Sequence, residues 1–506
     1  MTTRISTYSR ENGGRVLLLF LLFLLAIYQF ITAGFNSFAI VCTIPFLIFG
    51  AIIVFKWRMS AFWLLIFINY FIQWKEFPYL GIPVSLPNEI LQILLLGIAI
   101  IDARETPHFE RAANLMFFAL VIWCGFCTLE ILNDTCGLGI NISAWYTGAR
   151  MMAFQLLYTF LVFSIYISSP EILTRYLKVW ACLSLFSALW TFKQQYIGLA
   201  TNEMNFLYGA GRSTHIIQGG TLIRYFSTFS DAANYGCNVG AAATAFAVFG
   251  ITAKLQRDRR LYIISSIIAV IAMFASGTRS AMFCMAGGFV VFLILSKSFR
   301  IMIPSAIIGV FIFSILAFTN IGQGNQQIRR MRSAFRKGDA SVQVRDINQE
   351  TMRKYMQDAP WGIGLGMGFK EVPANNKYNR MATIPPDSDY VYIWLRTGRI
   401  GISIFVITML IMLGGACKIV LFKLKNPTLI GIGGGLCSSF VAFQLGGYAN
   451  QVLMQFPNCL LFYGGLTIVY LLPYLEPDWI KYEQNLFAKQ EERKRLKLEK
   501  KLASRV

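Results

Sequence analysis

The segment PPDSDYVYIWLRTGRIG, residues 385–401, carries an unusual set of reactive side chains at the start of an apolar run. Two carboxylates, Asp387 and Asp389, flank a serine, and either one is a candidate general base because a carboxylate can accept the proton of an attacking hydroxyl. Tyr390 and the aromatic residues after it either stack against a sugar or belong to the aromatic belt of a membrane interface. The segment therefore predicts acid–base chemistry at a membrane surface.

Arginines occur at places where membrane topology gives no reason for them. Arg224 opens RYFSTFSDAANYG, Arg279 lies in SGTRSA between two apolar runs, and Arg345 lies in a long polar loop. A charge near the membrane interior costs at least about 2.5 kcal/mol, so such residues are expected to have a function. Because guanidinium groups bind phosphate through paired hydrogen bonds, these three predict a phosphate site. Asp231 and Asn234, which enter the next apolar run, are candidates for positioning an acceptor.

The composition indicates that membrane helices hold these residues. The chain has 506 residues, of which 56% are hydrophobic and 14% charged, whereas soluble proteins carry about 25% charged residues. A helix needs roughly 20 apolar residues to cross a bilayer, and continuous rather than alternating runs favour helices over a barrel. We predict an all-α polytopic integral membrane protein with about 14 transmembrane helices. The predicted spans are residues 16–35, 38–55, 61–74, 86–101, 115–132, 148–167, 176–197, 232–253, 261–275, 280–296, 301–319, 400–422, 428–446 and 458–474.

The net charge of +21 follows a topological pattern. Basic clusters such as KLQRDRR (254–260) fall in every second loop, and loops rich in Lys and Arg stay in the cytoplasm. We therefore expect one polytopic domain over residues 1–506 with both termini in the cytoplasm, and no nucleic-acid partner. The first apolar run lacks a small-residue cleavage site and is interpreted as an anchor. The basic tail, residues 475–506, is expected to form a solvated helix near anionic headgroups.

A long loop on the non-cytoplasmic side, residues 320–388, has internal order. Its segments 326–338 and 341–358 place apolar side chains on one helical stripe, which predicts two amphipathic helices folded over the spans. Arg329 or Arg330 of the first segment is a further candidate for the arginine site. The alternative is that these helices only anchor the loop at lipid headgroups.

Several common kinds of site are not predicted. The glycine-rich segment APWGIGLGMGF (359–369) has neither the strand-to-helix context of a dinucleotide fingerprint nor the Gly-Lys-Ser/Thr of a P-loop, and its glycines are expected to allow tight turns. The cysteines fall mostly inside predicted spans, without a Cys/His cluster, so we expect neither a metal site nor another cofactor. A site of arginines and acids at headgroup level suits a lipid-linked phosphate, whose diphosphate leaving group the arginines would stabilise.

Taken in order, these motifs resemble the O-antigen ligase and O-antigen polymerase superfamily of bacterial inner membranes, over roughly residues 220–405. The resemblance implies a metal-independent glycosyltransferase that takes a glycan from undecaprenyl diphosphate. It also implies that Arg224 and Arg279 hold the diphosphate and that Arg345 helps to position it. The motifs that carry the resemblance are RYFSTFSDAANYG, SGTRSA, VRD (344–346), APWGIGLGMGF and DSDYVYIWLRTGRIG.

One departure from the family pattern bears on the reaction. The position of the family's catalytic histidine holds Asp387, with Ser388 where asparagine is usual, and Asp389 is left as an alternative base. Because polymerases tolerate more variation here, we expect a polysaccharide polymerase that transfers the glycan to a hydroxyl of a second lipid-linked glycan at the periplasmic face.

Three alternatives to a polymerase remain at this point: a ligase that uses lipid A–core, a protein oligosaccharyltransferase, and a lipid-linked oligosaccharide flippase. A flippase would need polar residues along a central cavity, whereas here they gather at one face. The expected partners are the undecaprenyl-diphosphate-linked glycan, the bilayer, and a chain-length regulator or other polysaccharide-assembly proteins.

Overall fold

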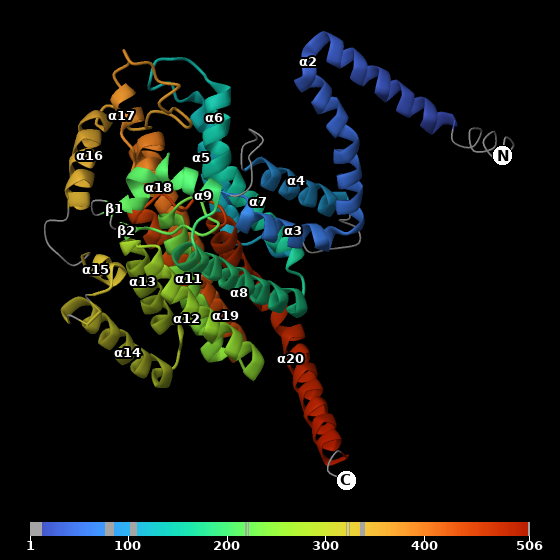
Figure 1. The fold of residues 1–506 in the computed structure, drawn as a ribbon, viewed down its shortest axis with the longest axis vertical. Coiled ribbons are helices and arrows are strands. Elements are labelled where there is room, and N and C mark those ends of the chain that lie inside the picture. The colour runs from blue at the N-terminus through green and yellow to red at the C-terminus, as the bar shows by residue number, and fades with distance from the viewer. Residues whose placement is uncertain are drawn as a thin grey trace. The chain divides into compact units, whose positions relative to one another are not determined.

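The computed structural model describes residues 13–75, 85–101, 109–217, 220, 222–319, 321–322, 324–333 and 340–503 (Figure 1). It is 79% helical, and one antiparallel hairpin, β1 (Ile216–Ile217) with β2 (Leu222–Ile223), occurs in this part of the chain. The longer helices are α2 (Gly13–Lys56), α3 (Arg58–Phe71), α4 (Leu86–Ile101), α5 (Leu115–Leu129), α7 (Gln155–Tyr166), α8 (Pro170–Phe192), α11 (Ala232–Thr252), α12 (Gln256–Ala275), α13 (Arg279–Leu295), α14 (Phe299–Phe318), α16 (Ala340–Met356), α18 (Asp389–Lys418), α19 (Pro427–Ala449) and α20 (Asn458–Ala503). The shorter ones are α6 (Ile142–Ala149), α9 (Thr201–Tyr208), α10 (Arg212–His215), α15 (Gln326–Ser333) and α17 (Asn379–Thr383), with 3₁₀ or π turns at Phe109–Ala112, Glu130–Leu132, Arg150–Phe154, Lys193–Ile197 and Ile419–Lys423.

The chain divides into two compact units, residues 1–63 and 64–506. In the first unit, the predicted spans 16–35 and 38–55 both fall within α2, which is broken at Gly34. The backbone there has φ 77°, a conformation that glycine adopts without a steric penalty. The two predicted segments are thus parts of one interrupted helix.

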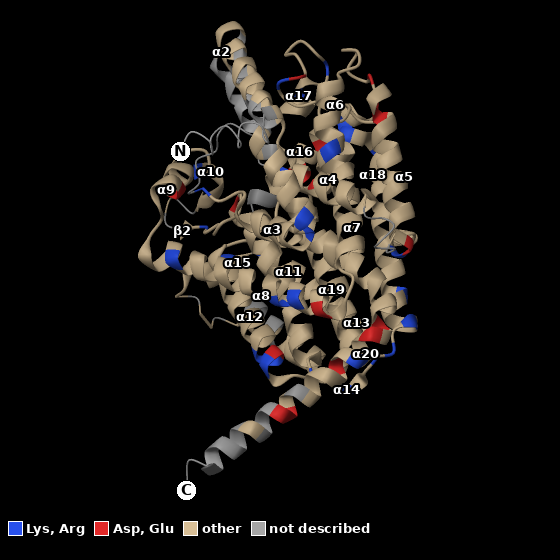
Figure 2. Cartoon of the chain, turned by 90° about the vertical axis from the view of Figure 1, so that its right-hand side faces the viewer, with Lys and Arg blue, Asp and Glu red and all other residues tan. Residues whose placement is uncertain are grey.

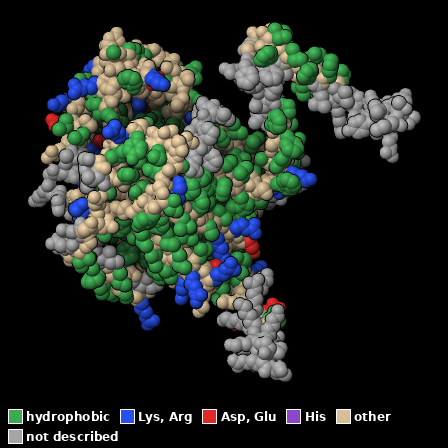
Figure 3. Space-filling model, in the orientation of Figure 1, with side chains coloured by type: hydrophobic (Ala, Val, Ile, Leu, Met, Phe, Trp, Pro, Cys, Tyr) green, Lys and Arg blue, Asp and Glu red, His purple; other side chains and the backbone are tan. Residues whose placement is uncertain are grey.

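Seven helical segments are long and apolar enough to cross a membrane among the described residues. The count rises to eight if the bent pair Ile48–Lys56 and Arg58–Phe71 forms one span, and four shorter apolar helices are also present. This agrees with an all-α multi-pass membrane protein, while the predicted number of about 14 spans stays a prediction. Figure 3 shows hydrophobic side chains over much of one face, as lipid contact requires. The seven segments are Leu115–Leu132, Ile142–Tyr166, Pro170–Ile197, Ala232–Thr252, Asp389–Lys423, Pro427–Ala449 and Asn458–Glu492.

The centre of the second unit is a bundle in which α11 packs against α12, α13 and α19. Small residues bring these helices close together. A Cβ atom on Gly240 of α11 would lie 2.9 Å from the Ala281 carbonyl oxygen of α13, and one on Gly288 would lie 2.7 Å from the Ser438 carbonyl oxygen of α19. Such approaches are typical of membrane helices, where packing rather than water exclusion drives association.

The predicted amphipathic segments are helices, α15 and α16; residues 334–339 between them lie outside the described part of the chain. Residues 340–388 do not form an isolated loop, because their apolar side chains share a small core with the start of α18 and with the loop at Cys136. This core therefore positions the segment that leads into Asp387. Its buried members are Cys136, Met352, Met356, Ala359, Ile363, Met367, Val372, Tyr378, Met381 and Leu395.

The glycine-rich segment 359–369 makes tight turns, as predicted. It lies against a break in α18 at Gly398 (φ 67°), where the Ile363 and Gly364 N–H groups donate to backbone carbonyl oxygens of α18 over 3.0 and 3.1 Å. A Cβ atom on Gly366 would lie 1.7 Å from the Ala144 carbonyl oxygen of α6, so only glycine fits there. The glycines thus serve close backbone packing.

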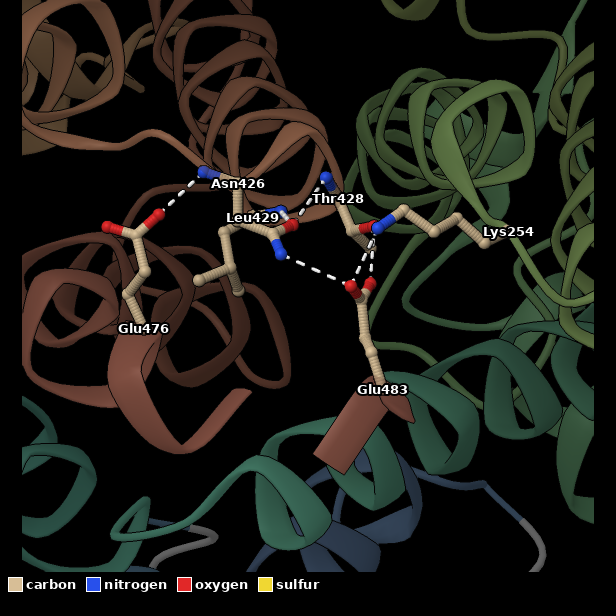
Figure 4. Close-up of polar contacts among 6 residues, drawn as sticks. All are labelled: Lys254, Asn426, Thr428, Leu429, Glu476 and Glu483. Atoms are coloured by element: carbon tan, nitrogen blue, oxygen red, sulfur yellow. Dashed lines mark hydrogen bonds and ion pairs between the residues drawn. The ribbon is translucent and has the colours of Figure 1, made fainter. Parts of the chain in front are cut away.

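At the opposite end of α11 from Asp231, carboxylates of α20 hold the helix ends together (Figure 4). Glu483 accepts hydrogen bonds from Lys254 Nζ at 2.6 Å, Thr428 Oγ1 at 2.7 Å and Asn426 Nδ2 at 3.2 Å. Glu476 accepts from the Asn426 N–H at 2.6 Å. Acidic and basic residues also lie together at this end in Figure 2. We call Lys254, Asn426, Thr428, Glu476 and Glu483 the Glu483 cluster.

Two details concern predicted features. Residues 475–503 of the basic tail continue α20 as one helix. Cys124 and Cys127 form a Cys-x-x-Cys pair within α5. Both cysteines are free and buried. Burial inside a predicted span makes these thiols packing groups.

Candidate functional site

The N-terminus of α11 is built around Asp231. Its Oδ1 accepts hydrogen bonds from the Ala233 and Asn234 N–H groups at 2.8 and 2.9 Å, which makes it the N-cap of the helix. Asn234 is fully buried, and its Nδ2 donates to the Phe456 carbonyl oxygen at 2.9 Å. Of the two candidate positioning residues, Asp231 is half-buried and lies at the mouth of the bundle, whereas Asn234 joins α11 to the segment before α20.

Arg224 follows the β1–β2 hairpin and reaches across the N-terminus of α11. Its guanidinium donates to the Thr214 carbonyl oxygen at 2.9 Å, to Thr278 Oγ1 at 2.9 Å and to the Ser276 carbonyl oxygen at 3.3 Å. All three acceptors are neutral. Because guanidinium has five N–H donors, these bonds fix its orientation and leave donors for a ligand.

The short break between α12 and α13 brings two more arginines to Arg224. Arg279 starts α13, and its Nη1 donates to Ser333 Oγ of α15 at 3.3 Å. From α15, Arg330 Nε donates to the Gly277 carbonyl oxygen at 2.8 Å. Gly277 (φ 58°) lies between the side chains of Arg224 and Arg330. A Cβ atom there would be 3.2 Å from Arg224 Cγ and 3.6 Å from Arg330 Cδ. Of the alternatives Arg329 and Arg330, the structure thus brings Arg330 to the site.

The cations are close enough to act on one another. The pKa of Arg224 is lowered, first by burial; Asp231 opposes this effect, and the charges of Arg279 and Arg345 add to it. Arg345 of α16 therefore lies within electrostatic range of Arg224. We call Arg224, Arg279, Arg330 and Arg345 the arginine cluster. Gathered like charges are favourable only when an anion can neutralise them, so the arrangement suits a multiply charged anion such as a diphosphate.

The structure separates the two candidate acids. Asp389 is 2% exposed, and its Oδ2 accepts hydrogen bonds from the Val452 and Leu453 N–H groups at 2.6 and 2.8 Å. Ser388 caps α18 and donates to the Gly447 carbonyl oxygen at 3.1 Å. These bonds tie the start of α18 to the end of α19 and the segment after it, so the geometry gives Asp389 a positioning role.

Asp387 lies two residues before the start of α18 and is half-buried. No hydrogen bond or ion pair from the described residues engages its carboxylate, which leaves it open to a substrate. The neighbouring Ser388 contacts the end of α19, and from there Asn450 Nδ2 donates to Ser280 Oγ beside Arg279. The starts of α13 and α18 thus meet at the end of α19, which brings Asp387 and Arg279 to the same end of the bundle.

Tyr390 points into the bundle. Its hydroxyl donates to Gln444 Oε1 of α19 at 2.9 Å, and its ring packs edge-on against Phe405 at 6.0 Å between centroids. Gln444 in turn donates to the buried Tyr463 hydroxyl at 3.4 Å. This places Tyr390 in helix packing, which differs from both alternatives predicted for it, sugar stacking and an aromatic belt at the membrane interface.

Two basic residues near the arginine cluster were not among the sequence candidates. Burial lowers the pKa of Lys75, Asp231 opposes this, and its ammonium lies 4.3 Å from the centroid of the Phe206 ring. His215 is buried, and its Nε2 accepts a hydrogen bond from the Ala232 N–H at 3.1 Å. Burial, and next the charge of Arg224, lower the His215 pKa to about 4. The hairpin folds His215 back onto α11, and no local pattern signals that contact.

A comparison with known families covers part of this region. Residues 264–406 match the O-antigen ligase family. This match supports the O-antigen ligase and O-antigen polymerase superfamily, which the motifs resemble. The matched segment includes Arg279, Arg345 and Asp387, while Arg224 precedes it. No curated protein matches the chain.

Proposed function

We propose that this multi-pass membrane protein is a polysaccharide polymerase. It transfers a glycan from undecaprenyl diphosphate to a hydroxyl of a second lipid-linked glycan, at the periplasmic face of the bacterial inner membrane, with both termini in the cytoplasm. The supporting observation is the arginine cluster. Arg224 follows a hairpin, Arg279 starts α13, Arg345 belongs to an amphipathic helix, and the charges of Arg279 and Arg345 both act on Arg224.

In the proposed reaction the arginines bind the donor through its diphosphate. The bond between the anomeric carbon and the diphosphate oxygen breaks, and the electron pair leaves with that oxygen. Arg224 is held in place by its three neutral acceptors before the substrate arrives, so it can stabilise the developing charge without reorganisation. The leaving group departs as polyprenyl diphosphate, and no metal ion is required for this role.

Asp387 is the proposed general base. The acceptor hydroxyl oxygen forms the new bond to the anomeric carbon, its proton passes to the Asp387 carboxylate, and the resulting carboxyl group releases the proton to water. Partial burial removes competing solvent from the carboxylate and favours this transfer. Asp389 holds the segment after α19 through Val452 and Leu453, and so maintains the position of Asp387 two residues before it.

A ligase that transfers the glycan to lipid A–core is the second candidate, because the matched family is described as O-antigen ligase. Deletion of the gene, followed by gel analysis of surface and lipid-linked glycans, separates the two. A polymerase deletion leaves single repeat units on the surface. A ligase deletion leaves bare core and long chains on the carrier lipid. Unchanged glycan ladders would contradict both functions.

A further inference from the structure

A basic groove lies between α16 and α18. It encloses about 460 Å³. Polar and aromatic side chains of α16 and of the first four turns of α18 line it, and it opens at the surface. The residues that matter for its chemistry are Gln349, Arg353, Trp394, Arg399, Ile402 and Ser403.

The two arginines of the groove carry exposed, uncompensated charge. Arg353 of α16 and Arg399 of α18 have no hydrogen bond or ion pair within the described part of the chain. By contrast, Lys354, next to Arg353 but outside the groove, pairs with Glu350 at 3.6 Å. Two guanidinium groups that converge from different helices, without a carboxylate between them, are suited to grip a phosphate.

The groove continues into an apolar surface along α18. Arg399, Ser403 and Ile407 follow one another at four-residue spacing, and Leu410 continues the same face. Ile407 is 55% exposed and Leu410 is 62% exposed. Trp394 at the groove is typical of the membrane interface. A phosphate held by the arginines would thus have a hydrocarbon-compatible surface directly beside it, which is the chemistry of a lipid phosphate.

This groove is separate from the arginine cluster. Arg345 and Arg353 lie eight residues apart on α16, which corresponds to about 12 Å along the helix axis. None of the four arginines of the arginine cluster lines the groove. A polymerase needs two lipid-linked substrates, each with its own diphosphate, and the arginine cluster accounts for the donor.

We propose that the groove binds the diphosphate of the acceptor, a second polyprenyl-linked glycan, with its prenyl chain along the exposed face of α18. The assignment rests on the proposed polymerase function, because a ligase or an oligosaccharyltransferase uses only one lipid-linked diphosphate. It gives the chain two phosphate sites on one helix: Arg345 belongs to the donor site and Arg353 to the acceptor site.

The test is the stoichiometry of binding of undecaprenyl diphosphate to the full chain in bilayer discs of zwitterionic lipid. The wild type is expected to bind two equivalents. The double variant Arg353→Ala/Arg399→Ala should bind one, and so should Arg279→Ala, which retains the groove. Lys354→Ala is the matched control, because it removes a neighbouring cation of α16 outside the groove, and it should bind two.

Two equivalents in the double variant would overturn the proposal. So would displacement of the probe from the groove by equimolar phosphatidylglycerol, which would show a general site for anionic lipid, or equally tight binding of inorganic pyrophosphate, which would show that the prenyl chain is not recognised. If instead Arg279→Ala binds two equivalents while the double variant binds one, the result contradicts the donor site at the arginine cluster and supports the acceptor site at the groove.

Discussion

The two ends of α11 use charge in opposite ways. At the Glu483 cluster one carboxylate accepts hydrogen bonds from Lys254, Thr428 and Asn426, so the charges neutralise one another. At the arginine cluster the guanidinium of Arg224 is bonded only to neutral acceptors, and the charges of Arg279 and Arg345 act against it.

The comparison separates stability from function. Paired charges with several hydrogen bonds hold helix ends together and leave nothing for a ligand. Crowded like charges cost stability and persist where an anion relieves the repulsion. Variants of the Glu483 cluster should therefore lower stability and spare the reaction, while variants of the arginine cluster and of Asp387 should stop the reaction and spare the fold.

The largest expected effect is at Asp387. Asp387→Asn removes the general base, which should lower the rate of chain extension by roughly 10²–10⁴-fold. Binding of the donor lipid and the melting temperature should remain near wild type. The assay is extension of purified lipid-linked repeat units by the full chain, followed on a gel. Asp358→Asn, an exposed acid of the same loop that pairs with Lys377, is the control and should keep full activity.

If the chain-extension rate of Asp387→Asn stays within threefold of the wild-type rate, Asp387 is not the general base. Asp389→Asn sharpens the same comparison, because its carboxylate accepts two backbone hydrogen bonds. It should lower the melting temperature and the rate together, whereas Asp387→Asn should lower the rate alone.

The next effect concerns the Glu483 cluster. Glu483→Ala removes an ion pair and two further hydrogen bonds, and we expect it to destabilise the fold by about 1–3 kcal/mol. The melting temperature in detergent should fall, while the extension rate of the folded fraction should match the wild type. A variant with normal melting temperature and no activity would show that this end of the bundle takes part in the reaction.

A further effect links pH to the arginine-bearing end. His215 has a pKa of about 4 in the fold, against roughly 6.5 in the unfolded chain. The unfolded state therefore binds the extra proton between these values, and the stability that neutral His215 contributes, about 3 kcal/mol, is present above pH 6.5 and lost as pH falls toward 4. The melting temperature of the wild type should fall across this window, and that of His215→Gln should fall less. Equal slopes in the two proteins would contradict the assignment.

The sequence predicted those features that follow from a local pattern, such as a charged residue beside an apolar run. Arg224 and Arg279 stood out because a charge beside an apolar run is costly, and the structure brings them together. The helices at 326–333 and 340–356 were predictable from apolar periodicity. The turns of the glycine-rich segment followed from the backbone freedom of glycine.

Other features depend on contacts between distant parts of the chain. In the sequence, Asp389 was an alternative candidate for the general base. Only the fold shows that its Oδ2 accepts hydrogen bonds from backbone amides more than 60 residues away. Lys75 reaches the site through an electrostatic interaction with Asp231. Tyr390 turns inward because its hydroxyl donates a hydrogen bond to Gln444. No periodicity or local motif encodes these contacts.

The most direct test of the account is the affinity of the full chain for undecaprenyl diphosphate at the arginine cluster, measured in the Arg353→Ala/Arg399→Ala background so that one site remains. Arg279→Ala should weaken binding at least about tenfold, because it removes charge-assisted hydrogen bonds to phosphate. Arg279→Lys should restore it poorly, since an ammonium group cannot replace the planar fork. Lys377→Ala, which removes a cation of the same loop, should bind like the parent. Equal affinities in the parent and in Arg279→Ala would contradict the account.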